Sequence, residues 1–124
     1  IKVLPYVPGR IIEIITFEIK HYAGLDIRAV YEALAHRRSA NRSYVLIYLP
    51  DKYKEEWEAI LADLCSAATD HGIGVIRASE PDKYDRWEEL VEAGFHQPDP
   101  ERMNDMIARQ VSADFHRTLI TWFR

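Results

Sequence analysis

The chain has 124 residues, of which 48% are hydrophobic, and a formal net charge of −4 at pH 7. This length suits a single domain of ordinary size with a real core, so we expect one domain over residues 1–124. The acidic balance excludes a globally basic nucleic-acid binder, and there is no run of about 18 apolar residues that would indicate a membrane span. Any contact with a polyanion must therefore be local.

The chain opens on Ile1 and shows no signal-peptide pattern. We expect either a domain excised from a longer protein or the ordered part of one, located in the cytoplasm. The single cysteine, Cys65, excludes an internal disulfide and a cysteine zinc site, and its place on an apolar helical stripe favours a buried, inert thiol. The histidines have no H-x-x-x-H or H-E-x-x-H spacing, so they do not indicate zinc.

The first part of the chain is typical of two strands followed by a helix. Residues 1–7 are a short strand candidate, and a turn at 8–10 leads into a long apolar strand at 11–20. That strand is hydrophobic on both faces, which predicts cover on both sides in a mixed sheet. Asp26 is placed to cap a helix that runs to about residue 40. The expected inner stripe of this helix is Ile27, Val30, Tyr31 and Leu34.

The middle of the chain alternates strands and helices. A buried strand is predicted at 43–49, and a helix follows from about residue 54 to residue 70, with Gly72 in its C′ position. A fourth strand is predicted at 73–79. Helices that separate successive strands act as crossovers, so the pattern predicts an α/β fold with a central mixed four-stranded sheet flanked by helices.

The last part of the chain is predicted to be mainly helical. We expect a short helix or turn at 87–95 and a final helix from Glu101, while the composition of 118–123 fits helix or strand. An apolar stripe runs along this segment: Met103, Ile107, Val111, Phe115 and Trp122. Packing on the sheet is the default interpretation, and an interface with a second copy or with other domains of a longer chain is the alternative.

The apolar strand at 11–20 ends in Glu18-Ile19-Lys20. Because strand side chains alternate, Glu18 and Lys20 share one face. Burial of either charge alone would be costly, so the two must reach solvent, neutralise each other or bind a ligand. An ion pair at a fraying strand end is the simplest interpretation.

The helix that follows carries Glu32 and His36 one turn apart. Three arginines, Arg37, Arg38 and Arg42, come next, before the following buried strand. They form a local basic patch on an acidic chain.

A hydrophobic strand ending in E-x-K, an amphipathic helix containing EALAH and a buried strand together resemble the core of the PD-(D/E)xK nuclease superfamily, which has the restriction-endonuclease-like fold. The resemblance covers roughly residues 1–80, and residues 18–50 are also similar to a group of uncharacterised bacterial proteins with this fold. It implies that Glu18 and the backbone carbonyl of Ile19 bind a divalent metal, magnesium or manganese. It also implies that Lys20 orients or activates the attacking water.

The resemblance implies contacts with nucleic acid as well. Many members carry a Gln or similar polar residue on the helix after E-x-K, with a tyrosine one turn later, near the DNA backbone. Glu32 and His36 stand at those positions, both as departures from the family pattern. Arg37, Arg38 and Arg42 would then contact the phosphates of DNA, or of RNA.

The main departure concerns the first acid of the motif. Members place an Asp, often after a Pro, on the strand before E-x-K, but here Tyr6 follows Pro5. Glu13 is the sole acid upstream of Glu18, and it has the opposite strand parity, so it would need a β-bulge to join the site. One carboxylate would bind a hard cation weakly. We therefore expect a degenerate site or a ligand from outside this segment.

Three functions remain open on the sequence. The first is a metal-dependent nuclease domain that hydrolyses DNA phosphodiester bonds, favoured by E-x-K and the basic patch. The second is a nuclease fold that has lost its metal site and binds nucleic acid or acts as a scaffold, favoured by the missing Asp. The third is a plain α/β interaction domain whose E-x-K is an ion pair, favoured by the net negative charge.

Overall fold

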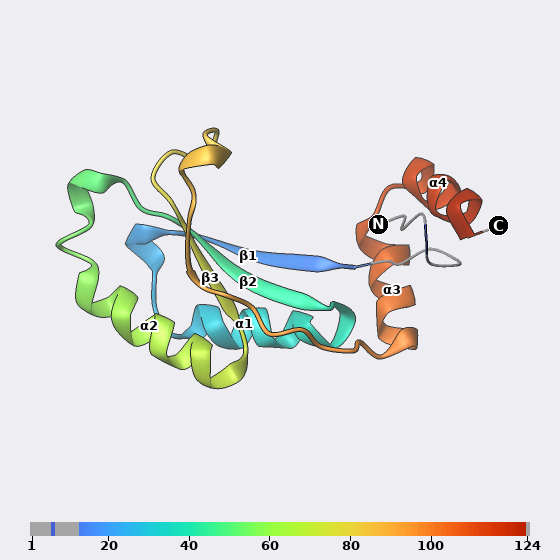
Figure 1. Cartoon of the computed structure of the whole chain (residues 1–124), viewed down its shortest axis with the longest axis horizontal. Coiled ribbons are helices and arrows are strands. Elements are labelled where there is room, and N and C mark those ends of the chain that lie inside the picture. Colours follow the sequence, from blue (N-terminus) through green and yellow to red (C-terminus); the bar gives the residue numbers. More distant parts are fainter. Residues whose placement is uncertain (1–5, 7–12, 124) are drawn as a thin grey trace.

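The computed structural model describes residue 6 and residues 13–123 (Figure 1). The predicted strand at 1–7 and turn at 8–10 lie outside the described residues, apart from Tyr6, and so do residues 11 and 12 of the long apolar strand.

The described chain forms a four-stranded mixed sheet in the order β1-β2-β3-β4. The strands are β1 (Ile15–His21), β2 (Arg42–Tyr48), β3 (Gly74–Ala78) and β4 (Glu88–Val91). The first three are parallel, and β4 runs antiparallel to β3. The α/β class and the mixed four-stranded sheet are thus confirmed, and within the described residues the fourth strand is β4.

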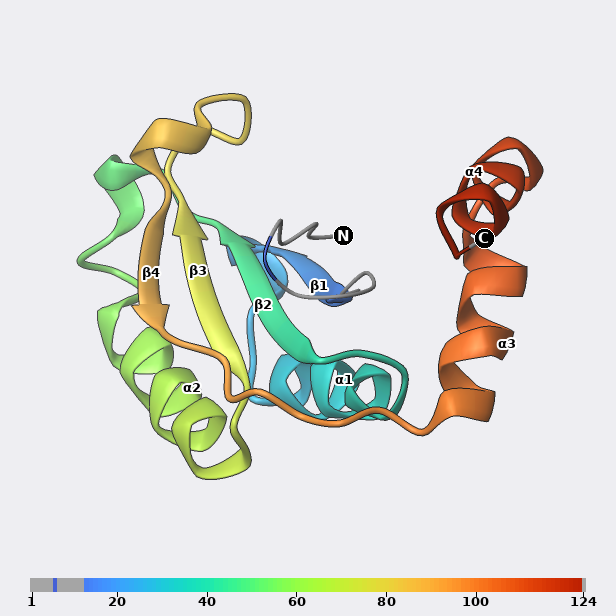
Figure 2. The ribbon, with the colours of Figure 1, turned by 45° about the vertical axis from the view of Figure 1, so that its right-hand side comes forward.

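Two crossover helices connect the parallel strands, α1 (Arg28–His36) after β1 and α2 (Glu58–His71) after β2. Both lie on the same side of the sheet (Figure 2). The core forms between them and the strands, where Val30 of α1 and Leu64 of α2 pack with Val45 and Ile47 of β2, all at most 1% exposed. The other face of the sheet carries neither helix.

The helix boundaries follow local chemistry. Ile27 directly precedes α1, and the Asp26 carboxylate, one residue further upstream, accepts a hydrogen bond from the backbone N–H of Arg28 at 2.8 Å. Gly72 ends α2 in the left-handed region at φ 70°, a conformation that favours glycine. Along α2, Cys65 is half-buried and not fully buried as predicted, and burial raises the pKa of its thiol, which disfavours the reactive thiolate.

The inner stripe of α1 agrees with the predicted one at Val30 and Leu34 and differs from it at Ile27 and Tyr31. Its buried residues are Ala29, Val30 and Ala33, whereas Ile27 and Tyr31 are 45% and 52% exposed. The helix is rotated toward its small residues because these let it lie close to the sheet.

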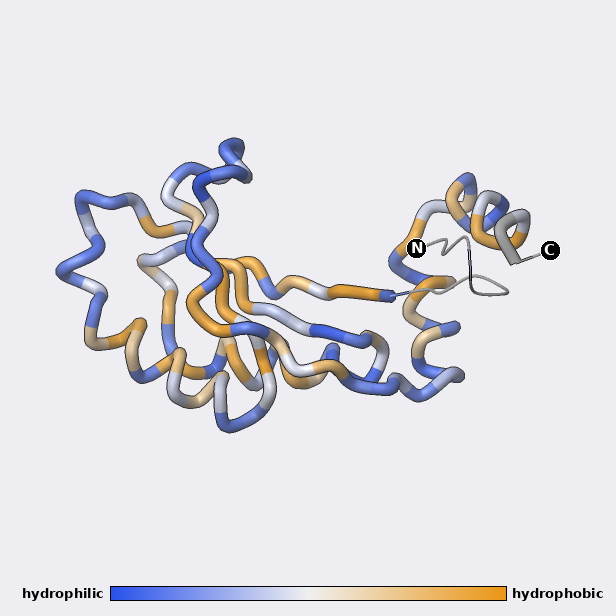
Figure 3. The backbone as a smooth tube through the Cα atoms, viewed as in Figure 1, coloured by the Kyte–Doolittle hydropathy of each residue, from blue (hydrophilic) through white to orange (hydrophobic). Residues whose placement is uncertain are grey.

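The strand β1 is an edge strand of the described sheet, and the described residues cover its apolar side only in part, as where Tyr44 stacks on Phe17. Ile15, Phe17 and Ile19 are 44%, 44% and 71% exposed on the face opposite α1, and hydrophobic and hydrophilic colours alternate along this strand in Figure 3. The predicted cover on both sides is therefore wrong for 15–21. Side chains alternate along a strand, and Glu18 and Lys20 face the helices. Phe17 and Ile19 must therefore face away from the helices.

The segment predicted as a helix or turn at 87–95 contains β4. Glu88 of β4 is opposite Arg77 of β3, and their ion pair at 2.6 Å supports the antiparallel register. This long-range pairing outweighs the helical character of the local sequence.

The chain ends in two helices, α3 (Pro100–Gln110) and α4 (Ala113–Phe123). The side chain of Asp99 caps α3 by accepting from the N–H of Glu101 at 2.9 Å. Both helices stand beyond the start of β1 instead of lying across the sheet (Figures 1 and 2). Their apolar residues meet Ile14 and Ile15 in a shared cavity of about 340 Å³.

A buried arginine, Arg77, connects β3 to β4 and to the segment that follows β2. Arg77 is 4% exposed, donates to the backbone carbonyl of Leu49 at 3.2 Å and forms ion pairs with Glu88 and Asp51. Burial lowers the pKa of Arg77, but the hydrogen bonds and ion pairs to these two carboxylates outweigh burial and raise it overall.

Replacement of this arginine should destabilise the fold. Arg77→Ala removes a buried hydrogen bond and two ion pairs, and we expect the free energy of unfolding to fall by about 2–4 kcal/mol. The matched control is Arg86→Ala, because Arg86 is exposed and lies 3.8 Å from Glu80; its effect should stay within about 0.5 kcal/mol. Urea unfolding followed by circular dichroism measures both, and equal effects of the two variants would contradict this role.

Candidate functional site

The E-x-K residues and the two polar residues of α1 meet on one face of β1. Glu18 and Lys20 alternate with Phe17 and Ile19, so both project toward the helix side. The helix α1 packs against β1 and β2. Its residues Glu32 and His36 therefore lie next to Lys20 and Glu18. The predicted shared face, with this helix alongside, is confirmed; the strand lies at the edge of the described sheet and not at its centre.

The four side chains form a continuous polar cluster. The Lys20 ammonium lies 2.5 Å from a carboxylate oxygen of Glu32 and 3.6 Å from one of Glu18. The second oxygen of Glu18 is 3.3 Å from Nε2 of His36. The side chains of Lys20 and Glu18 are 26% and 22% exposed, so the cluster remains open to solvent at one side.

The contact between Lys20 and Glu32 dominates the electrostatics of the cluster. The hydrogen bond from Lys20 holds the pKa of Glu32 below its usual range, against the opposing effect of burial. The pKa of Lys20 is raised, chiefly by its hydrogen bond to Glu32 and against a smaller effect of burial. The lysine is therefore an ammonium at neutral pH, held between two carboxylates.

The cluster contains two carboxylates but no complete metal site by itself. Among residue 6 and residues 13–123, no group of three or more His, Cys, Asp or Glu side chains is placed to hold a metal. Glu13 does not join Glu18, because it pairs with Arg42 at 2.8 Å near the start of β1.

Two of the three predicted phosphate-binding arginines have structural partners. Arg42 pairs with Glu13 and donates to the backbone carbonyl of Ala93 at 2.7 Å. Arg37 donates to the carbonyl of His71 at the end of α2, at 2.9 Å. Arg38 is exposed. The basic patch thus divides into two arginines that hold elements together and one that is accessible to a ligand.

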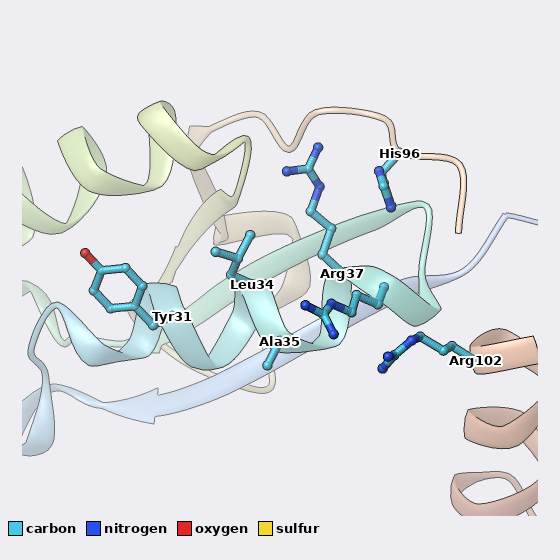
Figure 4. A pocket seen from close by; sticks show the side chains of 7 residues that line it. Tyr31, Leu34, Ala35, Arg37, His96 and Arg102 are labelled. Carbon is cyan, nitrogen blue, oxygen red and sulfur yellow. The ribbon is translucent and has the colours of Figure 1, made fainter. Parts of the chain in front are cut away.

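The structure adds two residues to this patch that the sequence analysis did not identify. His96, from the segment after β4, and Arg102, from α3, line one pocket together with Arg37 and Arg38 (Figure 4). Neither residue belongs to a recognisable motif, and both are more than 50 residues from Arg38, so no local signal in the sequence indicated this convergence.

No known protein family, curated protein or solved structure matches the chain. Within the described residues, none of the helices has the length and apolar character required to cross a membrane.

The link between Lys20 and Glu32 can be tested by titration. Lys20→Met removes the hydrogen-bond donor, so the pKa of Glu32 should rise toward its ordinary value. Since the pKa of Glu32 is lowered in the folded chain, this contact stabilises the fold above the ordinary pKa of a glutamate. The stabilisation is lost as the pH falls through the lowered pKa.

Carbon NMR of the Glu32 carboxyl group across the acid range measures this shift. Lys54→Met is the matched control, because Lys54 is 49% exposed and its contact is Glu88, at 3.9 Å. The control should leave the titration of Glu32 unchanged. An unchanged titration in Lys20→Met would contradict the contact.

Proposed function

We propose that this chain carries the E-x-K part of a metal-dependent nuclease site, on a restriction-endonuclease-like core, and that it acts on the phosphodiester bonds of DNA. The observation that carries the proposal is the Lys20 ammonium held between the carboxylates of Glu18 and Glu32. The chain order supports it, because an E-x-K strand, a crossover helix and a parallel buried strand follow one another as the resemblance implies.

The available donor atoms are oxygens, the type of ligand that a hard divalent cation prefers. Magnesium is commonly bound through one or two carboxylates, with waters and substrate phosphates as the other ligands. Glu18 and Glu32 supply two carboxylates within reach of one ammonium, and the resemblance adds the backbone carbonyl of Ile19. Magnesium or manganese, when bound, would neutralise charge that develops on the phosphate.

The side chains of the cluster have separable roles in this proposal. Lys20 is protonated at neutral pH because its pKa is raised, so it donates hydrogen bonds and supplies positive charge; it does not accept a proton. The ammonium would orient the attacking water and attract the phosphate. His36 contacts Glu18 at 3.3 Å and so holds that carboxylate in position.

The second candidate is a nuclease-fold module that binds DNA or RNA without cutting it. The distribution of contacts favours this function, because both carboxylates already contact Lys20 and the described residues form no group of three metal ligands. Such a module would retain the exposed Arg38 for phosphate contacts while the cluster serves as an ion pair.

Plasmid nicking with magnesium, with manganese and with EDTA separates the two candidates. If the cluster is catalytic, Glu18→Ala and Lys20→Ala should each lower metal-dependent nicking by at least about 100-fold, because each removes a group that acts on the reacting phosphate or its metal. The fold should persist in Lys20→Ala, since a partly exposed ion pair contributes only about 0–1 kcal/mol.

The matched control is Lys54→Ala. Lys54 lies just before α2 and contacts Glu88, outside the cluster, so this variant should retain nicking. Calorimetry with each metal gives an independent measure, and Glu18→Ala should lose any binding that the wild type shows. A wild-type chain that neither cuts DNA nor binds metal would overturn the catalytic proposal and favour the binding module.

A further inference from the structure

Four basic side chains converge outside the E-x-K cluster. Arg37 and Arg38 at the end of α1, His96 from the segment after β4 and Arg102 from α3 line a pocket of about 710 Å³. In Figure 4, Arg102 reaches from its helix toward the end of α1, and His96 lies above on the connecting segment. The remaining lining residues are uncharged: Tyr31, Leu34 and Ala35.

The backbone fixes this arrangement. The N–H of His96 donates to the carbonyl of Asn41 at 2.7 Å, and the side-chain amide of Asn41 donates back to the carbonyl of His96 at 3.2 Å. The N–H of Asp99 donates to the carbonyl of Arg38 at 3.1 Å. Asn41 is 5% exposed, so this connection belongs to the folded body. The first turn of α3, with Arg102, is thereby held opposite Arg38.

The pocket carries an excess of positive charge. In the part of the chain that the structure describes, no carboxylate forms an ion pair with Arg38 or Arg102, and no residue lining this pocket is acidic. Asp99 lines the adjoining pocket with Arg38, His96 and Arg102, and its side chain accepts from the N–H of Glu101. Arg37 uses one terminal nitrogen on the carbonyl of His71, while its buried Nε has no hydrogen-bond partner. Like charges held together raise the free energy, and a bound anion would relieve that repulsion.

The pocket is also distinct from the Glu18–Lys20 cluster. Glu32 and His36 project from α1 toward β1, whereas Tyr31, Leu34 and Ala35 form the pocket side of the same helix. An anion in the pocket therefore does not compete with the carboxylates of Glu18 and Glu32 for the Lys20 ammonium.

We propose that this pocket binds a phosphate group of a nucleic-acid strand. Guanidinium groups donate paired hydrogen bonds that match phosphate oxygens, and several of them around one site are typical of phosphate recognition. The phosphate is either a terminal phosphomonoester or an internal phosphodiester, since both present the same oxygens. The inference rests on the proposed function for its nucleic-acid partner, but it does not depend on cleavage.

Fluorescence anisotropy in EDTA tests the pocket while hydrolysis is prevented. The probes are single-stranded DNA oligonucleotides of one sequence, labelled at an internal base, with a 5′-phosphate, with a 3′-phosphate or with hydroxyls at both ends. Arg38→Gln and Arg102→Gln should each weaken binding about tenfold and lower the salt slope by about one, because each removes a phosphate contact. Inorganic phosphate should compete for the wild-type pocket.

The matched control is Arg109→Gln, which makes the same charge change on α3 away from this pocket. Preferential binding of one phosphorylated probe, lost in both pocket variants, would assign a terminal phosphate. Equal binding of all three probes, with both pocket variants weakened, would assign an internal phosphodiester. If Arg38→Gln and Arg102→Gln behave like the Arg109→Gln control, the inference is overturned. The binding experiment contains EDTA and so measures binding without cleavage. Its outcome therefore does not depend on whether the chain is a nuclease.

Discussion

The rest of the structure depends on the parallel pairing of β1 with β2. This pairing requires a crossover connection, and α1 in that connection packs against both strands. It forces every even residue at the end of β1 to face α1, so the charges of Glu18 and Lys20 meet the helix. The two crossover helices share one side of the sheet, and the core therefore has one layer of helices over one layer of strands (Figure 2).

This packing would be unfavourable if α1 presented an apolar surface to the two charges. Glu32 and His36 remove that cost, because one receives a hydrogen bond from Lys20 and the other contacts Glu18. The same contacts allow two readings of function. A cluster with two carboxylates and an ammonium is suited to phosphate chemistry with a metal, and it is also a satisfied set of ion pairs. The basic pocket on the other side of α1 adds a binding surface that either function can use.

Much of the fold and part of the site could be predicted because they follow from local rules. Alternation along a strand predicted the shared face of Glu18 and Lys20, and helical spacing predicted that Glu32 and His36 would lie one turn apart. The left-handed Gly72 at the end of α2 follows from the same local chemistry. Buried apolar runs separated by amphipathic helices were enough for the α/β class.

The sequence by itself therefore determined the elements and the faces on which their polar residues lie, because these depend on neighbours within about one turn or one strand. Tertiary structure decided which partner each charged residue meets. Arg42 pairs with Glu13, 29 residues away, and Glu88 of β4 pairs with Arg77 of β3. The exposure of Phe17 likewise depends on which face the helices cover. Such pairings join separate segments of the chain. A local sequence pattern therefore cannot predict them, because the contacts form only when the chain has folded.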